Sequence, residues 1–170
     1  IFIIHFLSKL VLGEVAQISI KNKVDGEVGL PKIAIGEAFI NEIGVEGDYN
    51  NFRMEKKKGT KKRAVLIHTV EMLNQLKKEG WPIKWGDLGE NILLRGIKYE
   101  KIKLNMKFEI GEIILEVAEI CNPCNNLAEL EYVGKENVKE FILSLKGRRG
   151  WYCKVVKDGT VKKGDKVKLL

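Results

Sequence analysis

Three cysteines, Cys121, Cys124 and Cys153, have the widest chemical scope of any residues in this chain. A cysteine thiolate can act as a nucleophile, carry a further sulfur atom or ligate a metal. Cys124 lies in the run N-P-C-N-N-L, just beyond an apolar stretch at 112–120 that reads as a strand. A thiol in a loop at a strand end is accessible, so we predict that Cys124 is the working residue. Cys121 and Cys153 continue apolar strand patterns, which indicates packed core thiols.

Cys121 and Cys124 form C-N-P-C, a spacing that also occurs in zinc sites and redox pairs. Zinc takes four donors, and the chain offers only Cys153, His5 and His68 as further natural ligands, none of them paired at ligand spacing. A thioredoxin-like pair opens a helix within a β-α-β unit, whereas the segment before Cys121 is rich in strands. Both alternatives are disfavoured, but a thiol-disulfide protein using Cys121 and Cys124 stays a competing hypothesis.

The charge balance favours an anionic partner. The 30 Lys and Arg residues exceed the 23 Asp and Glu, which gives a formal charge of +7 and a pI near 9.2. The densest run, K-K-K-G-T-K-K-R at 56–63, is typical of a solvated loop or of a loop that closes over an anionic cofactor. A nucleic-acid surface interleaves aromatic residues for stacking, and only Phe52 lies nearby. Nucleic acid is therefore disfavoured as a partner, and a non-catalytic nucleic-acid-binding β-barrel is kept as the alternative from another class.

Three arginines have the chemistry to support a reactive thiol. A nearby cation lowers the pKa of a thiol, and the planar guanidinium holds phosphate through two N–H groups. We predict that Arg63, Arg148 or Arg149 lies close to Cys124, activates it and holds an anionic ligand. The alternative is that these arginines form ordinary surface ion pairs.

Polar residues beside glycines form a second group of candidates. Glu90 and Asn91 follow Gly86 and Gly89 at the start of an apolar run, so their side chains either stabilise a loop or face a ligand. Asp48 in G-V-E-G-D-Y has the same two interpretations. The three tryptophans either stack on a flat ligand or pack at the edge of the core.

Short runs rich in β-branched and aromatic residues predict the elements that position these residues. We expect strands at 14–20, 36–40, 63–68, 90–94, 107–110, 112–120, 151–156 and 166–170. Asp158-Gly159 predicts a two-residue hairpin turn. Helical spacing predicts two helices, 70–78 after a Thr69 cap and 136–145, which would pack against a sheet rather than against each other.

Many short strands with few helices favour a mainly β, β-rich α+β fold. We predict a closed or nearly closed antiparallel β-barrel with two or three peripheral helices, because closure removes exposed strand edges. With 170 residues and 45% hydrophobic content, we expect one domain over 1–170, with 1–12 as an N-terminal extension of uncertain role. The apolar opening I-F-I-I-H-F-L is too short to cross a membrane. The odd cysteine number and the lack of a cleavable leader predict the cytoplasm.

An ordered set of motifs resembles the MOSC domain, the C-terminal module of molybdenum-cofactor sulfurases, which also exists as a free-standing protein. The resemblance runs from about Gly13 to the C-terminus. It rests on the motifs G-V-E-G-D-Y, R-A-V-L, Glu71, G-D-L-G-E-N-I, Pro123-Cys124, R-R-G-W-Y and the closing D-G-T-V-K-K-G-D-K-V. Two departures stand out: Y-N-N-F replaces the histidine that many relatives place after Gly-Asp, and R-R-G replaces R-G-G.

The resemblance implies a β-rich barrel with a pocket built from strand ends and loops. Cys124 would carry sulfur as a persulfide, or would ligate molybdenum in a molybdopterin cofactor that reduces N-hydroxylated compounds. The cofactor-binding residues would be Asp48, Arg63, Glu90, Asn91, Arg148 and Arg149. A cysteine desulfurase or a molybdoenzyme would be the partner, and no pyridoxal phosphate is expected, because it belongs to the separate desulfurase domain of longer sulfurases. A carrier needs an exposed thiol, whereas a metal ligand should be recessed beneath a pterin.

Overall fold

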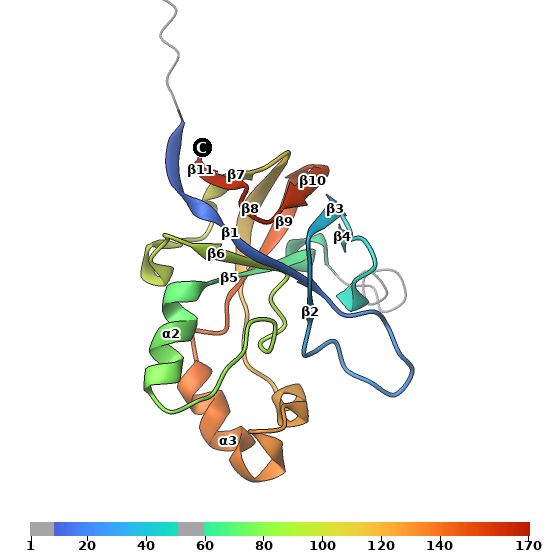
Figure 1. Ribbon diagram of the computed structural model, residues 1–170, viewed down its shortest axis with the longest axis vertical. Coiled ribbons are helices and arrows are strands. Elements are labelled where there is room, and N and C mark those ends of the chain that lie inside the picture. The colour runs from blue at the N-terminus through green and yellow to red at the C-terminus, as the bar shows by residue number, and fades with distance from the viewer. Residues whose placement is uncertain (1–8, 51–59) are drawn as a thin grey trace, which may run out of the picture.

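A closed β-barrel forms the centre of the molecule in the computed structural model, which describes residues 9–50 and 60–170 (Figure 1). Within these ranges the ring runs β11, β7, β8, β9, β5, β6, β1, and β11 pairs with β1 to close it. β2 adds to β1 outside the ring, and β10, β3 and β4 form a separate three-stranded sheet. The predicted mainly β, closed barrel is confirmed. The strands are β1 Leu10–Ile20, β2 Ile33–Ile35, β3 Glu37–Asn41, β4 Gly44–Val45, β5 Val65–Thr69, β6 Ile92–Arg95, β7 Lys107–Ile110, β8 Ile113–Ile120, β9 Trp151–Lys157, β10 Gly159–Lys162 and β11 Lys166–Leu169.

One pair of barrel strands departs from the predicted antiparallel pattern. β5 and β6 are parallel, with Ile67 opposite Ile92. The chain leaves β5 through α2 (Val70–Lys78) and returns through a loop to the start of β6. Parallel neighbours need such a crossover, because a tight turn can only reverse the chain. The antiparallel prediction fails at this pair, and the other described pairings are antiparallel.

The hairpin predicted at Asp158-Gly159 is wrong. β9 pairs with β8 along its length and with β5 over Trp151–Cys153, and no pairing joins it to β10 in the described chain. β10 instead joins β3 in the second sheet, where Val161 lies opposite Ala38. The local turn chemistry was overridden by long-range strand pairing.

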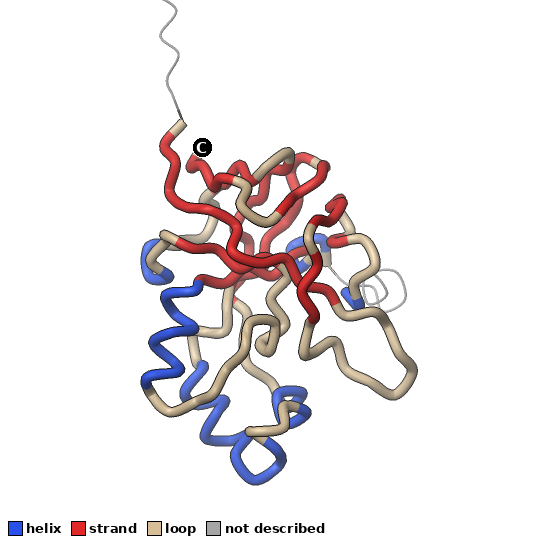
Figure 2. The backbone as a smooth tube through the Cα atoms, in the orientation of Figure 1, coloured by secondary structure: helices blue, strands red, loops and turns tan. Residues whose placement is uncertain are grey.

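Both predicted helices are present on one side of the barrel (Figure 2). The Thr69 hydroxyl caps α2 by accepting a hydrogen bond from the Met72 backbone N–H at 3.2 Å, as predicted. α3 spans Gly134–Leu145, and the structure also has three short 3-10 helices, η1 Lys61–Arg63, η2 Tyr99–Lys101 and η3 Asn125–Glu129. No helix in the described ranges has the length and apolar character needed to cross a membrane.

Two hydrophobic clusters hold the fold together. One fills the barrel, where alternate residues of β8 point inward, and Phe108 and Ile67 are fully buried. The other lies between the barrel and the helices, and both α2 and α3 contribute to it. α2 packs on β5 and β6, as predicted for a helix on a sheet. Both helices contribute to the same cluster, and Trp81, in the loop after α2, contacts Phe141 of α3 with ring centroids 4.7 Å apart.

The barrel also revises the N-terminal boundary. β1 begins at Leu10, which lies opposite Leu169 of β11, so residues 10–12 of the expected extension belong to the barrel. Residues 1–8, which include the whole apolar opening, and residues 56–59 of the lysine-rich run lie outside the described residues.

Candidate functional site

Cys124 lies where β8 gives way to the loops at one end of the barrel. β8 ends at Ile120, and Cys124 is the extended residue directly before η3, with φ −141° and ψ 170°. Its thiol is exposed and forms no disulfide, whereas Cys121 and Cys153 are buried. The prediction that these two cysteines are core thiols is confirmed, with exposed fractions of 1% and 0%.

Arg149 is the charged neighbour of Cys124. Its Nη1 donates hydrogen bonds to Cys124 Sγ at 3.3 Å and to the Asn122 carbonyl at 3.1 Å, and its Nε donates to the Leu88 carbonyl at 3.3 Å. The residue is buried, and within the described chain its guanidinium has no Asp or Glu partner. Burial acts to lower the Arg149 pKa, but the adjacent Cys121 and Cys124 outweigh it and the pKa is raised, so the guanidinium stays charged. The charge beside Cys124 is thus left for a sulfur anion or an anionic ligand.

The turn that carries Arg149 is held by a buried histidine. His68 Nδ1 accepts a hydrogen bond from the Thr69 backbone N–H at 2.8 Å, so Nε2 carries the proton and donates it to the Arg148 carbonyl at 2.9 Å. Burial lowers the pKa of His68 to about 4, which keeps the ring neutral. Gly150 has φ +117°, and its N–H donates to the Tyr99 hydroxyl at 3.0 Å. A side chain at Gly150 would meet the Ile67 carbonyl at 2.7 Å, which explains the glycine after the arginine pair.

The Arg148 side chain extends from the same turn in another direction, away from the pocket beside Cys124. Its Nη1 forms an ion pair with Glu79 at 2.9 Å, and its Nε donates to the Ser144 carbonyl at 2.9 Å. It does not line the pocket beside Cys124, so of the two neighbouring arginines only Arg149 is in position to contact a ligand there.

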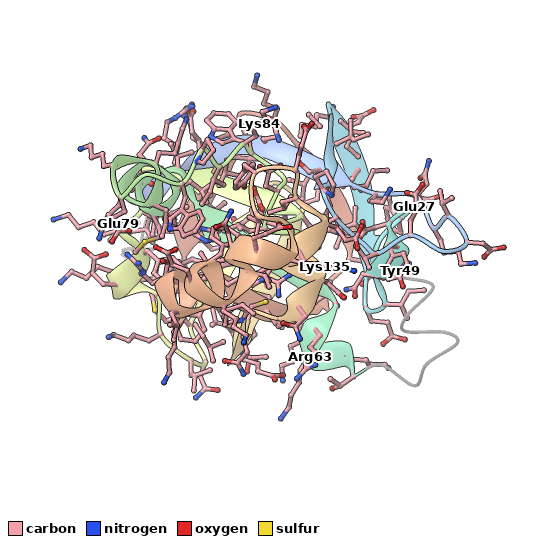
Figure 3. All side chains as sticks on the ribbon, turned by 90° about the horizontal axis from the view of Figure 1, so that it is seen from below. Glu27, Tyr49, Arg63, Glu79, Lys84 and Lys135 are labelled. Atoms are coloured by element: carbon pink, nitrogen blue, oxygen red, sulfur yellow. The ribbon has the colours of Figure 1, made fainter. Side chains whose placement is uncertain are left out.

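A pocket of about 240 Å³ opens beside the Cys124 sulfur. Segments far apart in the sequence line it, and Cys124, Arg149, Arg63 and Asn91 are the predicted site residues among them. Two of the lining residues, Tyr49 and Arg63, are labelled in the view from below (Figure 3). None of the three tryptophans lines this pocket. The aromatic residues in its lining are Tyr49 and Tyr152.

Arg63 is in the pocket wall but already has a carboxylate partner. Its Nη2 and Nε donate to the two Glu119 oxygens at 2.5 and 3.0 Å, and its guanidinium lies 5.6 Å from the centre of the Tyr152 ring. These hydrogen bonds lower the pKa of Glu119. Arg63 therefore brings less net charge to the pocket than Arg149.

Asp48 and Lys32 form a buried ion pair. Lys32 is part of the pocket wall, and Asp48 lies behind it. Lys32 Nζ donates to both Asp48 oxygens at 2.5 and 2.6 Å, and the side chains are 6% and 0% exposed. Lys32 lines the pocket, whereas Asp48 does not. Asp48 thus orients a second cation instead of facing a ligand. Sequence reasoning missed Lys32, because its partner lies 16 residues away and the lysine belongs to no periodic pattern.

The G-D-L-G-E-N motif is a scaffold for this lysine. Gly86 has φ +99° and approaches the Lys32 carbonyl so closely that a side chain would clash, and the Lys32 N–H donates to the Gly86 carbonyl at 2.9 Å. Glu90 is buried behind the wall, where Oε1 accepts from the Gly86 N–H at 2.5 Å. Its Oε2 is buried with no partner in the described chain, and burial raises the Glu90 pKa to about 7.

Asn91 lines the pocket and also forms hydrogen bonds that stabilise the surrounding structure. Its Oδ1 accepts from the Leu66 N–H at 3.1 Å, and its Nδ2 donates to Asp48 Oδ2 at 3.1 Å and to the Ser19 carbonyl at 3.3 Å. These bonds join β1, β5 and the ion pair at the edge of the pocket. Most of the hydrogen-bonding capacity of Asn91 is used within the protein, so the loop-stabilising interpretation describes it best.

The chain belongs to the MOSC domain family, whose model matches residues 54–168. It is 30% identical over 91 residues to the uncharacterized protein YflK of Bacillus subtilis, covering 52% of this chain and 39% of that protein. It is 28% identical over 140 residues to a protein named reductase from Gibberella moniliformis, covering 79% of this chain and 24% of that one. The matched region therefore spans well under half the length of both relatives.

Two solved structures show the same fold. The YuaD protein of Bacillus subtilis superposes with a TM-score of 0.77 at 18% identity, over 92% of this chain and 94% of that one. YiiM of Geobacillus stearothermophilus superposes with a TM-score of 0.69 at 19% identity, over 92% and 74%. At these identities the likeness supports the barrel architecture.

Proposed function

We propose that this MOSC domain protein binds a molybdopterin-type anionic ligand and uses Cys124 to carry sulfur as a persulfide. The observation that supports this most directly is the exposed thiol 3.3 Å from a buried guanidinium that has no carboxylate partner in the described chain. A charge-assisted hydrogen bond stabilises a sulfur anion at this position, and a persulfide is largely anionic at neutral pH. The family supports the proposal, because the MOSC domain is the C-terminal module of molybdenum-cofactor sulfurases.

The proposed step is a transfer of sulfane sulfur without net oxidation. The Cys124 thiolate attacks the outer sulfur of a donor persulfide, such as one formed on a cysteine desulfurase. A new S–S bond forms at Cys124, the donor S–S bond breaks, and the donor leaves as a thiolate. Attack by an acceptor on the outer sulfur then releases the Cys124 thiolate. Arg149 would stabilise the negative charge before and after transfer.

The pocket chemistry is compatible with one part of a molybdenum cofactor. Its volume, about 240 Å³, lies below the roughly 300–1,000 Å³ of sites that enclose a drug-sized ligand, so it would hold one end of a larger molecule. Lys32 and Arg149 provide positive charge, and a thiolate is a soft donor suited to a transition metal. This donor set favours a second candidate, in which Cys124 ligates molybdenum and the bound cofactor supplies the redox chemistry for reducing an N-hydroxylated substrate.

Sulfur loading tests the first role. After incubation with inorganic polysulfide and desalting, the wild-type mass should increase by one sulfur atom, and cyanide should release that atom as thiocyanate. Cys124→Ser should gain none, and Cys121→Ser should load like wild type because the Cys121 thiol is buried. Equal loading of Cys124→Ser and wild type would rule out the carrier role.

Molybdenum retention tests the second role. Purified protein is mixed with molybdenum cofactor, passed through a desalting column and analysed for bound metal. Cys124→Ser should retain much less molybdenum than wild type if the sulfur is a ligand. Equal retention would eliminate ligation by Cys124 while leaving the sulfur-loading result intact.

The positive charge of Arg149 should favour the reaction of Cys124 with anionic reagents over its reaction with neutral ones. We expect Arg149→Gln to lower the ratio of the iodoacetate to the iodoacetamide alkylation rate by about tenfold, since opposite charges about 4 Å apart near a surface interact by about 1–4 kcal/mol. The rates are followed by mass spectrometry of the Cys124 peptide. The double variant Arg63→Gln/Glu119→Gln is the matched control, because it removes a pocket ion pair without changing the net charge, and it should change the ratio far less. An unchanged ratio in Arg149→Gln would contradict an electropositive site.

A further inference from the structure

A second cavity lies on the other side of the arginine turn. It has a volume of about 680 Å³ and shares no lining residue with the Cys124 pocket. Its walls come from α2, from the segment around η2 and from the start of β9. Arg148, which lines this cavity, forms an ion pair with Glu79. In the view from below, Glu79 lies well away from Arg63, which lines the Cys124 pocket (Figure 3).

The walls of this cavity are mainly apolar and aromatic. Tyr99 and Trp151 contribute rings whose centroids are 6.5 Å apart with an interplanar angle of 36°. Met72, Ile102 and Leu104 supply the aliphatic surface, and Leu104 is 53% exposed. The volume lies within the range of about 300–1,000 Å³ found for small-molecule sites, and aromatic walls with few polar groups are typical of them. The lining therefore favours a flat apolar ligand.

The polar groups of the cavity favour a single negative charge on that ligand. Lys103 and Arg148 line it together with one carboxylate, Glu100. Arg148 is already paired with Glu79, whereas the Lys103 ammonium has no ion pair within the described residues. Lys103 is therefore the cavity group best placed to pair with an anionic group.

We propose that this cavity is a second ligand site, which binds a flat aromatic molecule carrying one anionic group. The proposal is independent of Cys124 chemistry, since the two cavities have no wall residue in common. The ligand would cover Tyr99 and Trp151, and its anionic group would pair with Lys103.

Binding of 8-anilinonaphthalene-1-sulfonate, a flat aromatic sulfonate, tests the site. Titration of the folded wild-type protein should give saturable binding of one probe per chain. Leu104→Asp should weaken binding by about tenfold or more, because it removes apolar contact and adds a like charge. Leu143→Asp is the matched control, since Leu143 is also exposed, at 74%, but does not line the cavity. Equal affinity of Leu104→Asp and wild type, or equal loss in both variants, would overturn the proposal.

Two further measurements test where the probe binds and whether its negative charge contributes to binding. In ¹⁵N spectra the Trp151 indole N–H signal, assigned with Trp151→Phe, should shift on titration more than those of the other two tryptophans. Lys103→Gln should weaken the sulfonate but leave the neutral N-phenyl-1-naphthylamine unaffected. Binding that disappears in Cys124→Ser, or an unshifted Trp151 signal, would refute this site whatever the outcome of the sulfur-loading experiment.

Discussion

Replacing Asp48 by alanine should lower the free energy of unfolding by about 3–5 kcal/mol, because it leaves a buried ammonium without its counter-charge. The Asp48 carboxylate is fully buried, and Lys32 is only 6% exposed. The carboxylate also accepts hydrogen bonds from the backbone N–H groups of Lys21 and Asn50 and from the Asn91 side chain. Urea denaturation at neutral pH measures the change.

Two controls separate the buried charge from a general effect of mutation. Adding Lys32→Met to Asp48→Ala should recover part of the loss, because no unpaired charge then remains. Glu119→Ala, which breaks the exposed pair with Arg63, should cost no more than about 1 kcal/mol. A loss below about 1 kcal/mol in Asp48→Ala, or no recovery in the double variant, would show that the pair is not a main support of the pocket wall.

His68 and Glu90 should give opposite pH dependences of stability that largely offset one another in the wild type. The pKa of His68 is lowered from 6.5 to about 4, so its contribution is present above pH 6.5 and is lost as the pH falls toward 4. The pKa of Glu90 is raised from 4.5 to about 7, so its contribution is present below pH 4.5 and is lost as the pH rises through 7. Between pH 4.5 and 6.5 the two effects therefore have opposite signs.

Single substitutions should expose each contribution. Relative to wild type, His68→Gln should become less stable as the pH rises from 4.5 to 6.5, and Glu90→Gln should become more stable, each by about 1.4 kcal/mol per pH unit at most. Glutamine keeps an acceptor for the Gly86 N–H in the second variant. Urea unfolding at several pH values gives the slopes. Parallel curves for the three proteins would mean that neither group titrates as its burial implies.

Much of the local structure follows from short sequence patterns. The helix at 70–78 was predicted to the residue, because its cap at Thr69 and its apolar spacing lie within the helix itself. The strand that ends before Cys124 and the buried thiols at Cys121 and Cys153 follow from alternation along one segment. The ordered motifs added the resemblance to the MOSC domain family, whose model matches residues 54–168.

The geometry of the candidate site depends on contacts between distant segments. Arg148 and Arg149 are identical and adjacent, and only the turn held by His68 and Tyr99 directs one to Cys124 and the other to Glu79. The β9–β10 turn shows the same limit, because its hairpin signal is local whereas β10 pairs with the distant strand β3.

By itself, the sequence determined the type and extent of helix α2 and of most strands, the closed β-rich fold class, and Cys124 as the candidate reactive thiol. These features follow from periodicity, helix caps and motif order, which can be read along the chain. Only the tertiary structure decided which cation meets that thiol, that Lys32 joins the pocket and that Glu90 is sealed behind its wall. These features arise when barrel closure brings together residues far apart in the chain, and burial then sets their charge and hydrogen bonding.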